Sequence, residues 1–298
     1  MKNRVAKPFL KWAGGKSQLI PQLSLLLPKE VIRSKYTYIE PFIGGGAMLF
    51  WLLNTYPDLE QAIINDANED LINTYRTIAS EPLALIDELL RYQMEYHNLS
   101  RSEQKRKSYF LDKRQLYNLR SCPNSIRAAL FIFLNKTCFN GLYRVNSKNQ
   151  FNVSADLSRI PTICDSENLL AVSKLLQRVE ILCGDFEQTL PMGCRDVFYF
   201  IDPPYKPISK TANFNAYACG GFGDNDQTRL RDHCVSLDEQ GCLWMLCNSD
   251  PKSNAAENSF FENLYRGYNF YRVMAKRNIN SIGTKRNEIT ELVITNYT

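Results

Sequence analysis

The chain has 298 residues, of which 44% are hydrophobic and 22% are charged, and its formal net charge is +5. This composition is typical of a globular protein with one large domain or two smaller ones. No apolar stretch is long enough to span a bilayer, and the mild positive charge permits a polyanionic partner without requiring one.

The cysteine and histidine content argues against a metal site. The nine cysteines include no Cys-x-x-Cys pair, and His97 and His233 are the two histidines. We therefore expect no metal and no disulfide framework. The N-terminus is basic and no apolar signal-peptide core follows it, so the sequence predicts a cytoplasmic protein with no membrane partner.

Strand-like and helix-like runs alternate at both ends of the chain. The pattern predicts strands at residues 36–39, 62–64, 179–182, 197–201, 242–247 and 292–295. Helices are predicted from 47–53, 69–80 and 83–96. Such alternation indicates a mostly parallel sheet with helices on its faces. The middle of the chain is basic and polar, which divides it into a first catalytic part (1–66), an inserted region (67–165) and a second catalytic part (166–298).

Near the start, Phe9-Leu10-Lys11-Trp12-Ala13-Gly14-Gly15-Lys16-Ser17 suggests a phosphate-binding loop at first sight. That loop has a further glycine five residues before Gly15, where this chain has Leu10, and a strand before it. We therefore exclude an ATPase. Lys16 can instead bind the carboxylate of a methionine moiety. Trp12 can pack beside a sulfonium or simply within the core.

The first predicted strand runs into Glu40 and then Pro41-Phe42-Ile43-Gly44-Gly45-Gly46. Glycines after a strand allow a tight turn and the close approach of a ligand. About twenty residues later Asp66 ends the next strand, at the spacing of an acid that binds ribose hydroxyls. The glycine spacing departs from that of dinucleotide sites, which favours a nucleoside without phosphates such as S-adenosylmethionine. A structural turn, with Asp66 capping a helix, remains the alternative.

Two short motifs follow later strands. Gly184-Asp185-Phe186 offers an acceptor for an adenine amine and a ring to lie against the base, although a lone tripeptide is weakly specific. The apolar run 197–201 ends in Asp202-Pro203-Pro204-Tyr205, where two prolines stop the strand. This rigid corner presents a carboxylate, free carbonyls and a ring to a planar amine. Taken alone, it is equally consistent with a capped turn.

Residues 139–153 are predicted to form a β-hairpin around the turn-forming Ser147-Lys148-Asn149. Arg144 and Lys148 lie on it, and arginine is the usual bidentate partner of guanine in the major groove. Phe139 and Tyr143 can stack or wedge where a base leaves the duplex. A polar surface hairpin without a DNA role is the alternative.

Together these motifs resemble the Dam-type DNA adenine-N6 methyltransferases, in which the cofactor motif precedes Asp-Pro-Pro-Tyr and the recognition region lies between them. The resemblance extends from residues 9–16 to Glu291-Leu292-Val293-Ile294-Thr295-Asn296-Tyr297. It implies an α/β, Rossmann-like, mostly parallel sheet with an inserted helical and β-hairpin target-recognition domain. It also implies S-adenosyl-L-methionine as the cofactor and double-stranded DNA as the partner.

With the motifs above, the resemblance assigns residues to three sites. The cofactor site would be lined by Trp12, Lys16, Phe42, Gly44, Asp66, Asp185, Phe186 and Asp202. The target adenine would be held by Asp202, Pro203, Pro204 and Tyr205. DNA would be contacted by Lys11, Phe139, Asn140, Arg144 and Lys148, with a guanine each for Lys11 and Arg144. Phe139 stands where relatives often have an intercalating tyrosine.

The resemblance further implies base flipping and favours GATC as the recognition sequence, with a cognate restriction endonuclease as a further partner if the enzyme belongs to a restriction–modification system. Other functions remain open. The same fold serves amine methyltransferases of RNA or protein, and a DNA-binding homologue without activity would keep it. A nicotinamide dehydrogenase is disfavoured by the glycine spacing.

Overall fold

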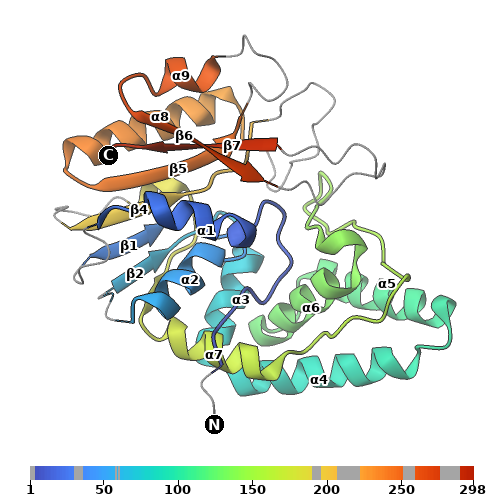
Figure 1. Ribbon diagram of the computed structural model, residues 1–298. Helices are drawn as coiled ribbons and strands as arrows, with labels where there is room; N and C mark the ends of the chain where they lie inside the picture. Colours follow the sequence, from blue (N-terminus) through green and yellow to red (C-terminus); the bar gives the residue numbers. More distant parts are fainter. Residues whose placement is uncertain are drawn as a thin grey trace.

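The computed structural model describes residues 4–29, 36–57, 59, 61–189, 196–206, 222–250, 259–275 and 289–298. Its centre is a seven-stranded sheet of order β3-β2-β1-β4-β5-β7-β6 (Figure 1). The strands are β1 (Thr37–Glu40), β2 (Gln61–Ile64), β3 (Val179–Ile181), β4 (Val197–Ile201), β5 (Leu243–Ser249), β6 (Asn269–Ala275) and β7 (Ile289–Thr295). Strands β1 to β5 pair in parallel, and β7 runs antiparallel between β5 and β6. The predicted mostly parallel sheet is confirmed.

All six strands predicted from the sequence are present; the bounds of β4 match and those of the other five differ by one to three residues. Strand β6 was not predicted. It is an edge strand paired with β7, and its exposed Arg272 and Met274 interrupt the apolar pattern that marks a buried strand.

Strand β4 lies at the centre of the sheet and is buried along its whole length. Its side chains alternate between two apolar clusters: Phe198 and Phe200 belong to one, and Val197, Tyr199 and Ile201 to the other. A strand that is covered on both faces needs apolar residues at every position, which explains its continuous apolar run. The residue that follows β4 is thereby fixed at the carboxyl edge of the sheet.

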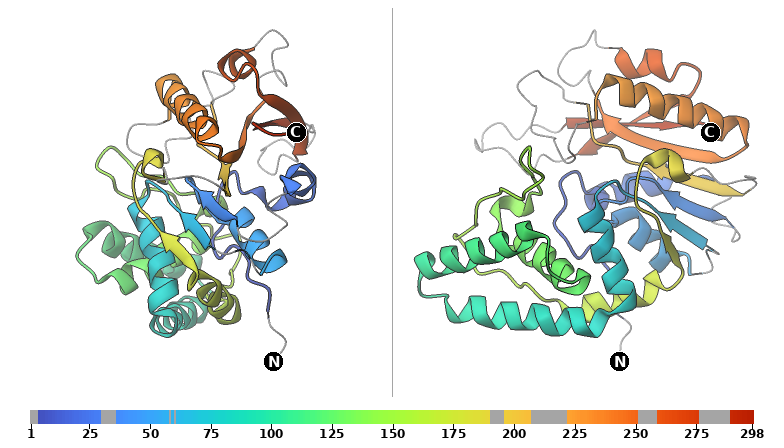
Figure 2. Two further views of the ribbon diagram at one scale, coloured as in Figure 1. Left: turned by 90° about the vertical axis from the view of Figure 1, so that its left-hand side faces the viewer. Right: turned by 180° about the vertical axis from the view of Figure 1, so that it is seen from behind.

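Helices cover both faces of the sheet, and a further helical group extends from one side of it (Figure 2). Their bounds are α1 (Ile20–Leu23), α2 (Ala47–Thr55), α3 (Glu69–Ser80), α4 (Pro82–Asn98), α5 (Glu103–Leu119), α6 (Asn124–Thr137), α7 (Ser166–Leu176), α8 (Asp224–Glu239) and α9 (Phe260–Leu264), with short 3₁₀ turns η1 (Lys16–Gln18), η2 (Ser24–Leu26), η4 (Phe139–Gly141) and η5 (Phe186–Thr189). The extending group consists of α4, α5 and α6, and α6 packs against α3, α4 and α5. None of the described helices has the length and apolar character needed to cross a membrane.

The predicted hairpin at residues 139–153 reverses direction as expected, but it contains an isolated β-bridge and no continuous strand. It begins with η4, and Val145 forms an isolated antiparallel bridge with Phe151. The side chain of Asn118 bonds both the N–H and the C=O of Phe151, at 2.8 and 3.0 Å. The Asn118 amide therefore forms hydrogen bonds with a backbone N–H and a backbone C=O that would otherwise be free to pair with a neighbouring strand.

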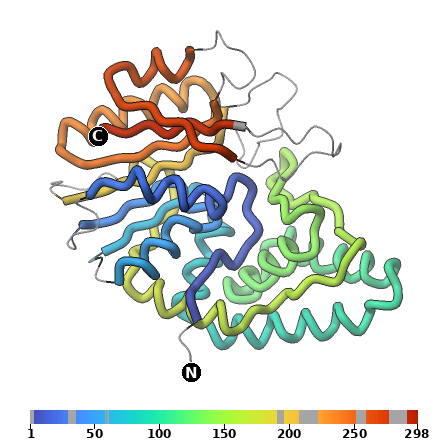
Figure 3. The backbone as a smooth tube through the Cα atoms, in the orientation of Figure 1, coloured from blue at the N-terminus to red at the C-terminus, as the bar shows by residue number. Residues whose placement is uncertain are grey.

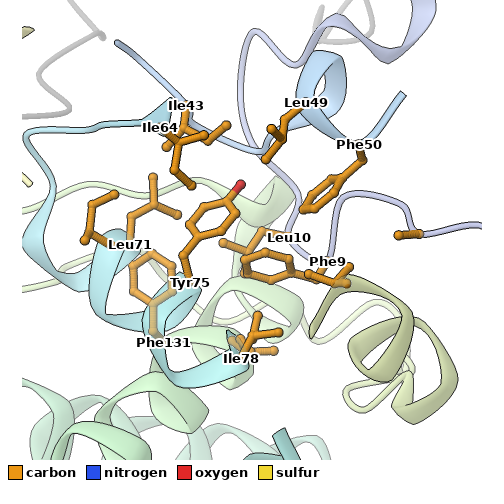
Figure 4. Close-up of a cluster of buried hydrophobic side chains, with 14 of the residues drawn as sticks. Phe9, Leu10, Ile43, Leu49, Phe50, Ile64, Leu71, Tyr75, Ile78 and Phe131 are labelled. Atoms are coloured by element: carbon orange, nitrogen blue, oxygen red, sulfur yellow. The ribbon is translucent and has the colours of Figure 1, made fainter. Parts of the chain in front are cut away.

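The N-terminal segment 4–15 has neither helix nor strand and runs past α6 (Figure 3). It is held by burial of Phe9 and Leu10, which are 3% and 5% exposed. The Phe9 ring lies 5.0 Å from that of Tyr75 and 6.4 Å from that of Phe50 (Figure 4). Full burial of such side chains stabilises by about 1.5–3 kcal/mol each, so the residues directly after them are fixed in place.

Candidate active site

A cavity of about 480 Å³ lies at the carboxyl edge of the parallel strands. It is next to the point where the strand order reverses, because β2 and β3 follow β1 on one side while β4 and β5 lie on the other. Open α/β sheets bind ligands at this switch point, and the volume suits a small molecule. The cavity is lined by all eight residues expected to bind the cofactor, namely Trp12, Lys16, Phe42, Gly44, Asp66, Asp185, Phe186 and Asp202, and by Pro203, Pro204 and Tyr205.

The glycine-rich turn after β1 forms one wall. Gly44 and Gly46 have φ angles of +47° and +70°, which glycine adopts without strain. A Cβ on Gly44 would lie 2.8 Å from the Trp12 ring, and one on Gly46 would lie 2.6 Å from the Tyr75 hydroxyl. The turn therefore has no room for larger residues, and Trp12 lies directly against it.

Asp66 follows β2 and lines the same cavity. Its carboxylate accepts hydrogen bonds from the backbone N–H of Gly44 at 3.1 Å and of Asn68 at 2.9 Å. Burial raises the pKa of Asp66 to about 6. The helix α3 is capped by the Asn68 side chain, so Asp66 is not needed as its cap. Each Asp66 oxygen retains capacity for a second donor such as a ribose hydroxyl.

Aromatic rings form another part of the cavity lining. The Phe42 ring lies 5.5 Å from that of Phe186 and 5.8 Å from that of Phe222. Asp185 lies beside them, and its carboxylate is 3.1 Å from the guanidinium of Arg229. Apolar rings with a polar group at their edge suit a planar heterocycle that carries an amine.

The Asp202 carboxylate lies at the cavity wall after β4. Its Oδ2 is 2.8 Å from the ammonium of Lys16, which also donates to the Gly14 carbonyl at 2.6 Å. Its Oδ1 is buried and has no hydrogen-bond partner in the part of the chain that the structure describes. One oxygen of the Asp202 carboxylate is thus paired with a cation, and the other is a buried acceptor without a partner among the described residues.

Tyr205 is held in place by two neighbours. Its hydroxyl donates to the Glu291 carboxylate at 2.5 Å, and the Lys16 ammonium lies 4.7 Å from its ring centroid. The same ammonium is 3.9 Å from Glu291. Lys16 therefore connects Asp202, Tyr205 and Glu291 in one buried cluster.

This cluster perturbs the pKa values of its members. Burial raises the pKa of Asp202 to about 6, although the Lys16 charge opposes that rise. Burial acts to lower the pKa of Lys16, but Asp202 and Glu291 together raise it above its ordinary value. Lys16 accordingly stays charged, and Asp202 is ionised above about pH 6.

The residues expected to contact DNA lie outside the cavity. The Phe139 side chain is 55% exposed and Asn140 has a left-handed φ of +54° in the same turn. The Nε atom of Arg144 donates to Asn152 Oδ1 at 2.7 Å. Lys148 is exposed, whereas the Lys11 amine is buried and partnerless among the described residues.

One of the two rings proposed to stack against DNA is unavailable. Tyr143 is 8% exposed, and its ring stacks on that of Trp12 with centroids 5.9 Å apart. Its hydroxyl lies 3.4 Å from the carboxylate of Asp70. The Tyr143 ring is therefore packed against Trp12 at the cavity wall and is not exposed at the surface, as a ring that wedges into DNA would need to be.

Sequence analysis missed several residues of these sites. Phe222, Arg229 and Glu291 line the cavity, and Asn152 holds Arg144. Glu291 had a detectable signal, since an acid within an otherwise apolar strand is rarely buried without a partner. The described residues contain no group of three or more histidine, cysteine or acidic side chains that could hold a metal ion.

The chain matches known methyltransferases over most of its length. Residues 12–279 match the family model of the D12 class N6 adenine-specific DNA methyltransferases. The chain is 46% identical over 295 residues to the type II methyltransferase M.MjaIII of Methanocaldococcus jannaschii, covering 98% of this chain and 99% of that one. It is 38% identical over 303 residues to the type II methyltransferase M1.LlaDCHI of Lactococcus lactis, covering 99% and 98%. A DNA adenine methylase of Vibrio cholerae is 34% identical over 288 residues, covering 96% and 95%.

These similarities cover nearly the whole chain. They decide among the substrates left open by the sequence in favour of DNA, and the family's methyltransferase activity implies S-adenosylmethionine as the methyl donor. The resemblance to Dam-type enzymes is confirmed, and the chain belongs to the D12 class N6 adenine-specific DNA methyltransferase family.

Proposed function

We propose that this protein transfers a methyl group from S-adenosylmethionine to the exocyclic amine of an adenine that has been flipped out of duplex DNA, within GATC. The observation that carries the proposal is the buried, partnerless Oδ1 of Asp202 in the cavity at the switch point. It offers one acceptor for an incoming N–H next to the rings and acids that suit the cofactor.

The cavity fits the cofactor in size and chemistry. Asp66 would accept hydrogen bonds from the ribose hydroxyls, and Phe42 and Phe186 would enclose the adenine ring with Asp185 at its amine. The Lys16 ammonium would pair with the methionine carboxylate. When bound there, the cofactor supplies an electrophilic methyl group.

The concave setting of the acceptor supports base flipping. Asp202 and Tyr205 lie in a concave site at the edge of the sheet, and a base that remains stacked in a duplex cannot enter it. Since Lys16 lies over one face of the Tyr205 ring, the other face would stack on the flipped adenine. Unstacking and unpairing the base costs roughly a few kcal/mol, which these contacts would offset.

Asp202 would act by orienting the amine. Its Oδ1 and the Pro203 carbonyl would accept the two N–H bonds, which draws the nitrogen toward tetrahedral geometry and directs its lone pair at the methyl carbon. Pro204 would keep this corner rigid. Catalysis would then come mainly from positioning and from fixed dipoles, without a covalent enzyme intermediate.

Recognition would be divided between two segments of the chain. Arg144 and Lys11 would each bind a guanine, Phe139 would wedge beside the flipped base, and Asn140 and Lys148 would contact the DNA from the same turn. Apart from Lys11, these residues belong to the inserted region 67–165, so recognition would rest mainly on that region, and catalysis on 1–66 and 166–298. The protein would act on cytoplasmic DNA, and a cognate restriction endonuclease would be a further partner if it belongs to a restriction–modification system.

The test is to express the protein in a host without adenine methylation and to sequence its DNA for N6-methyladenine. We expect methylation of GATC and none with an Asp202→Asn control. Methylation of another sequence would contradict the GATC assignment while leaving the chemistry intact. Unmodified DNA from cells that contain folded protein would overturn the proposed activity.

Methyl transfer is expected to fall below about pH 6. Burial raises the pKa of Asp202 to about 6, and the ionised carboxylate is the acceptor, so protonation as the pH falls through 6 removes it. With saturating cofactor, kcat/KM for DNA should drop about tenfold per pH unit below that value and be level above it. A profile that stays level to about pH 5, with the protein still folded by circular dichroism, would contradict this role.

A further inference from the structure

We propose that Asn135 is a positioning residue for base recognition, because its carboxamide joins the segment that carries Lys11 to the turn Phe139–Gly141 that leads to Arg144. The inference rests on the proposed guanine-binding roles of Lys11 and Arg144. In this proposal Asn135 contacts no base itself but sets the spacing of the Lys11 and Arg144 side chains, which would contact the bases.

Asn135 lies near the end of α6 and is 4% exposed. Its Oδ1 accepts a hydrogen bond from the Lys11 N–H at 2.9 Å. Its Nδ2 donates to the carbonyls of Lys11 and Gly141, at 2.8 and 2.9 Å. Both donors of the amide are thus used, and they hold two backbone segments that are distant in sequence.

The two segments are in direct contact. Gly141 has a φ of +66°, and a Cβ on it would lie 2.5 Å from the Lys11 Cβ and 2.8 Å from its Cδ. The Lys11 side chain therefore lies along the backbone of the turn. Because its amine has no partner among the described residues, the direction of this side chain depends on how its backbone is held.

The next part of the turn is fixed to the same structure. Tyr143 stacks on Trp12, which directly follows Lys11, and Arg144 comes directly after Tyr143. The Asn135 amide thus closes a small ring of contacts between the two guanine-binding residues. Loss of the amide frees both backbones at once, which would shift both side chains relative to the DNA.

A second asparagine provides a matched control. Asn168 on α7 is also 4% exposed, and it clamps the backbone of Lys7 in the same way: Oδ1 accepts from the N–H at 2.9 Å and Nδ2 donates to the C=O at 3.0 Å. In the sequence, the buried Phe9 and Leu10 lie between Lys7 and Lys11. Asn168 therefore anchors the same segment without contacting the recognition turn.

The experiment compares Asn135→Ala with Asn168→Ala. For each variant, kcat/KM is measured on a duplex with the sequence methylated in cells and on duplexes with one G·C pair replaced. We expect Asn135→Ala to reduce this discrimination by about tenfold and Asn168→Ala to leave it within about twofold. Thermal melting and calorimetric cofactor binding should change to a similar extent in both, since each loses a buried clamp.

The variants Lys11→Ala and Arg144→Ala test the proposed guanine-binding roles separately from the proposed role of Asn135. If neither relaxes discrimination, the proposed guanine-binding roles fail. If these two variants do relax discrimination, and Asn135→Ala discriminates between duplexes as well as Asn168→Ala does, the inference about Asn135 is overturned.

A positioning role also predicts that the Lys11→Ala substitution reduces discrimination less in the Asn135→Ala background than in the unaltered protein, whereas additive losses would contradict it. Should Asn135→Ala not fold, Asn135→Asp, which keeps the acceptor and lacks both donors, replaces it in the same comparisons.

Discussion

Replacing Asp202 with asparagine is expected to lower kcat for methyl transfer by about 10²- to 10³-fold. The two carboxylate oxygens have different tasks, because Oδ2 pairs with Lys16 and Oδ1 is left for the amine. An asparagine would turn its oxygen toward the Lys16 cation, which places its NH₂ where the adenine amine also donates. Methyl transfer from labelled cofactor, with DNA binding followed by fluorescence anisotropy, measures the effect.

The matched control is Asp250→Asn. Asp250 is a 2% exposed acid at the end of β5 that pairs with Arg272 at 2.9 Å, and it does not line the cavity. Both variants should lose stability through a weakened ion pair, and we expect Asp202→Asn alone to lose catalysis while it still binds DNA. A kcat for Asp202→Asn within about tenfold of the unaltered enzyme would contradict the proposed mechanism.

Replacing Arg144 with alanine is expected to relax sequence preference at one base pair by about 1–3 kcal/mol. Nε of Arg144 donates to the Asn152 side chain at 2.7 Å and one terminal nitrogen donates to the Asn152 backbone carbonyl at 3.5 Å, which orients the guanidinium for a bidentate contact with guanine. Lysine at this position should not restore the preference, because it lacks the planar fork. Methylation rates on duplexes substituted at each position in turn measure the change.

Lys148→Ala serves as the comparison for Arg144. Lys148 is exposed at the tip of the same turn, and its backbone N–H bonds to Asn146. If it contacts phosphate, its loss should weaken binding on all sequences alike and reduce the salt dependence by about one unit. An Arg144→Ala enzyme that shows this uniform pattern, with its preference intact, would remove Arg144 from base recognition.

Local sequence patterns predicted most of the sheet because its central strands are covered on both faces. The continuous apolar run of β4 and the prolines after it mark both the strand and its end. The same reasoning failed for β6, whose partly exposed edge position leaves no regular pattern. It predicted the hairpin at residues 139–153 but not that its pairing is limited to an isolated bridge, where the Asn118 side chain from α5 bonds the backbone of Phe151.

The sequence by itself determined the chemical groups of this protein and their place at strand ends: Asp66 after β2, Asp202 after β4, and glycines after β1. These follow from short-range constraints, since apolar runs, prolines and glycines fix the local backbone. The tertiary structure decided which groups meet. Lys16 lies against Asp202 and Glu291, and Asn135 joins Lys11 to Gly141, because parallel strands and packed helices bring distant segments to one edge. Contacts of this kind depend on the burial of side chains from several elements at once, which no local pattern encodes.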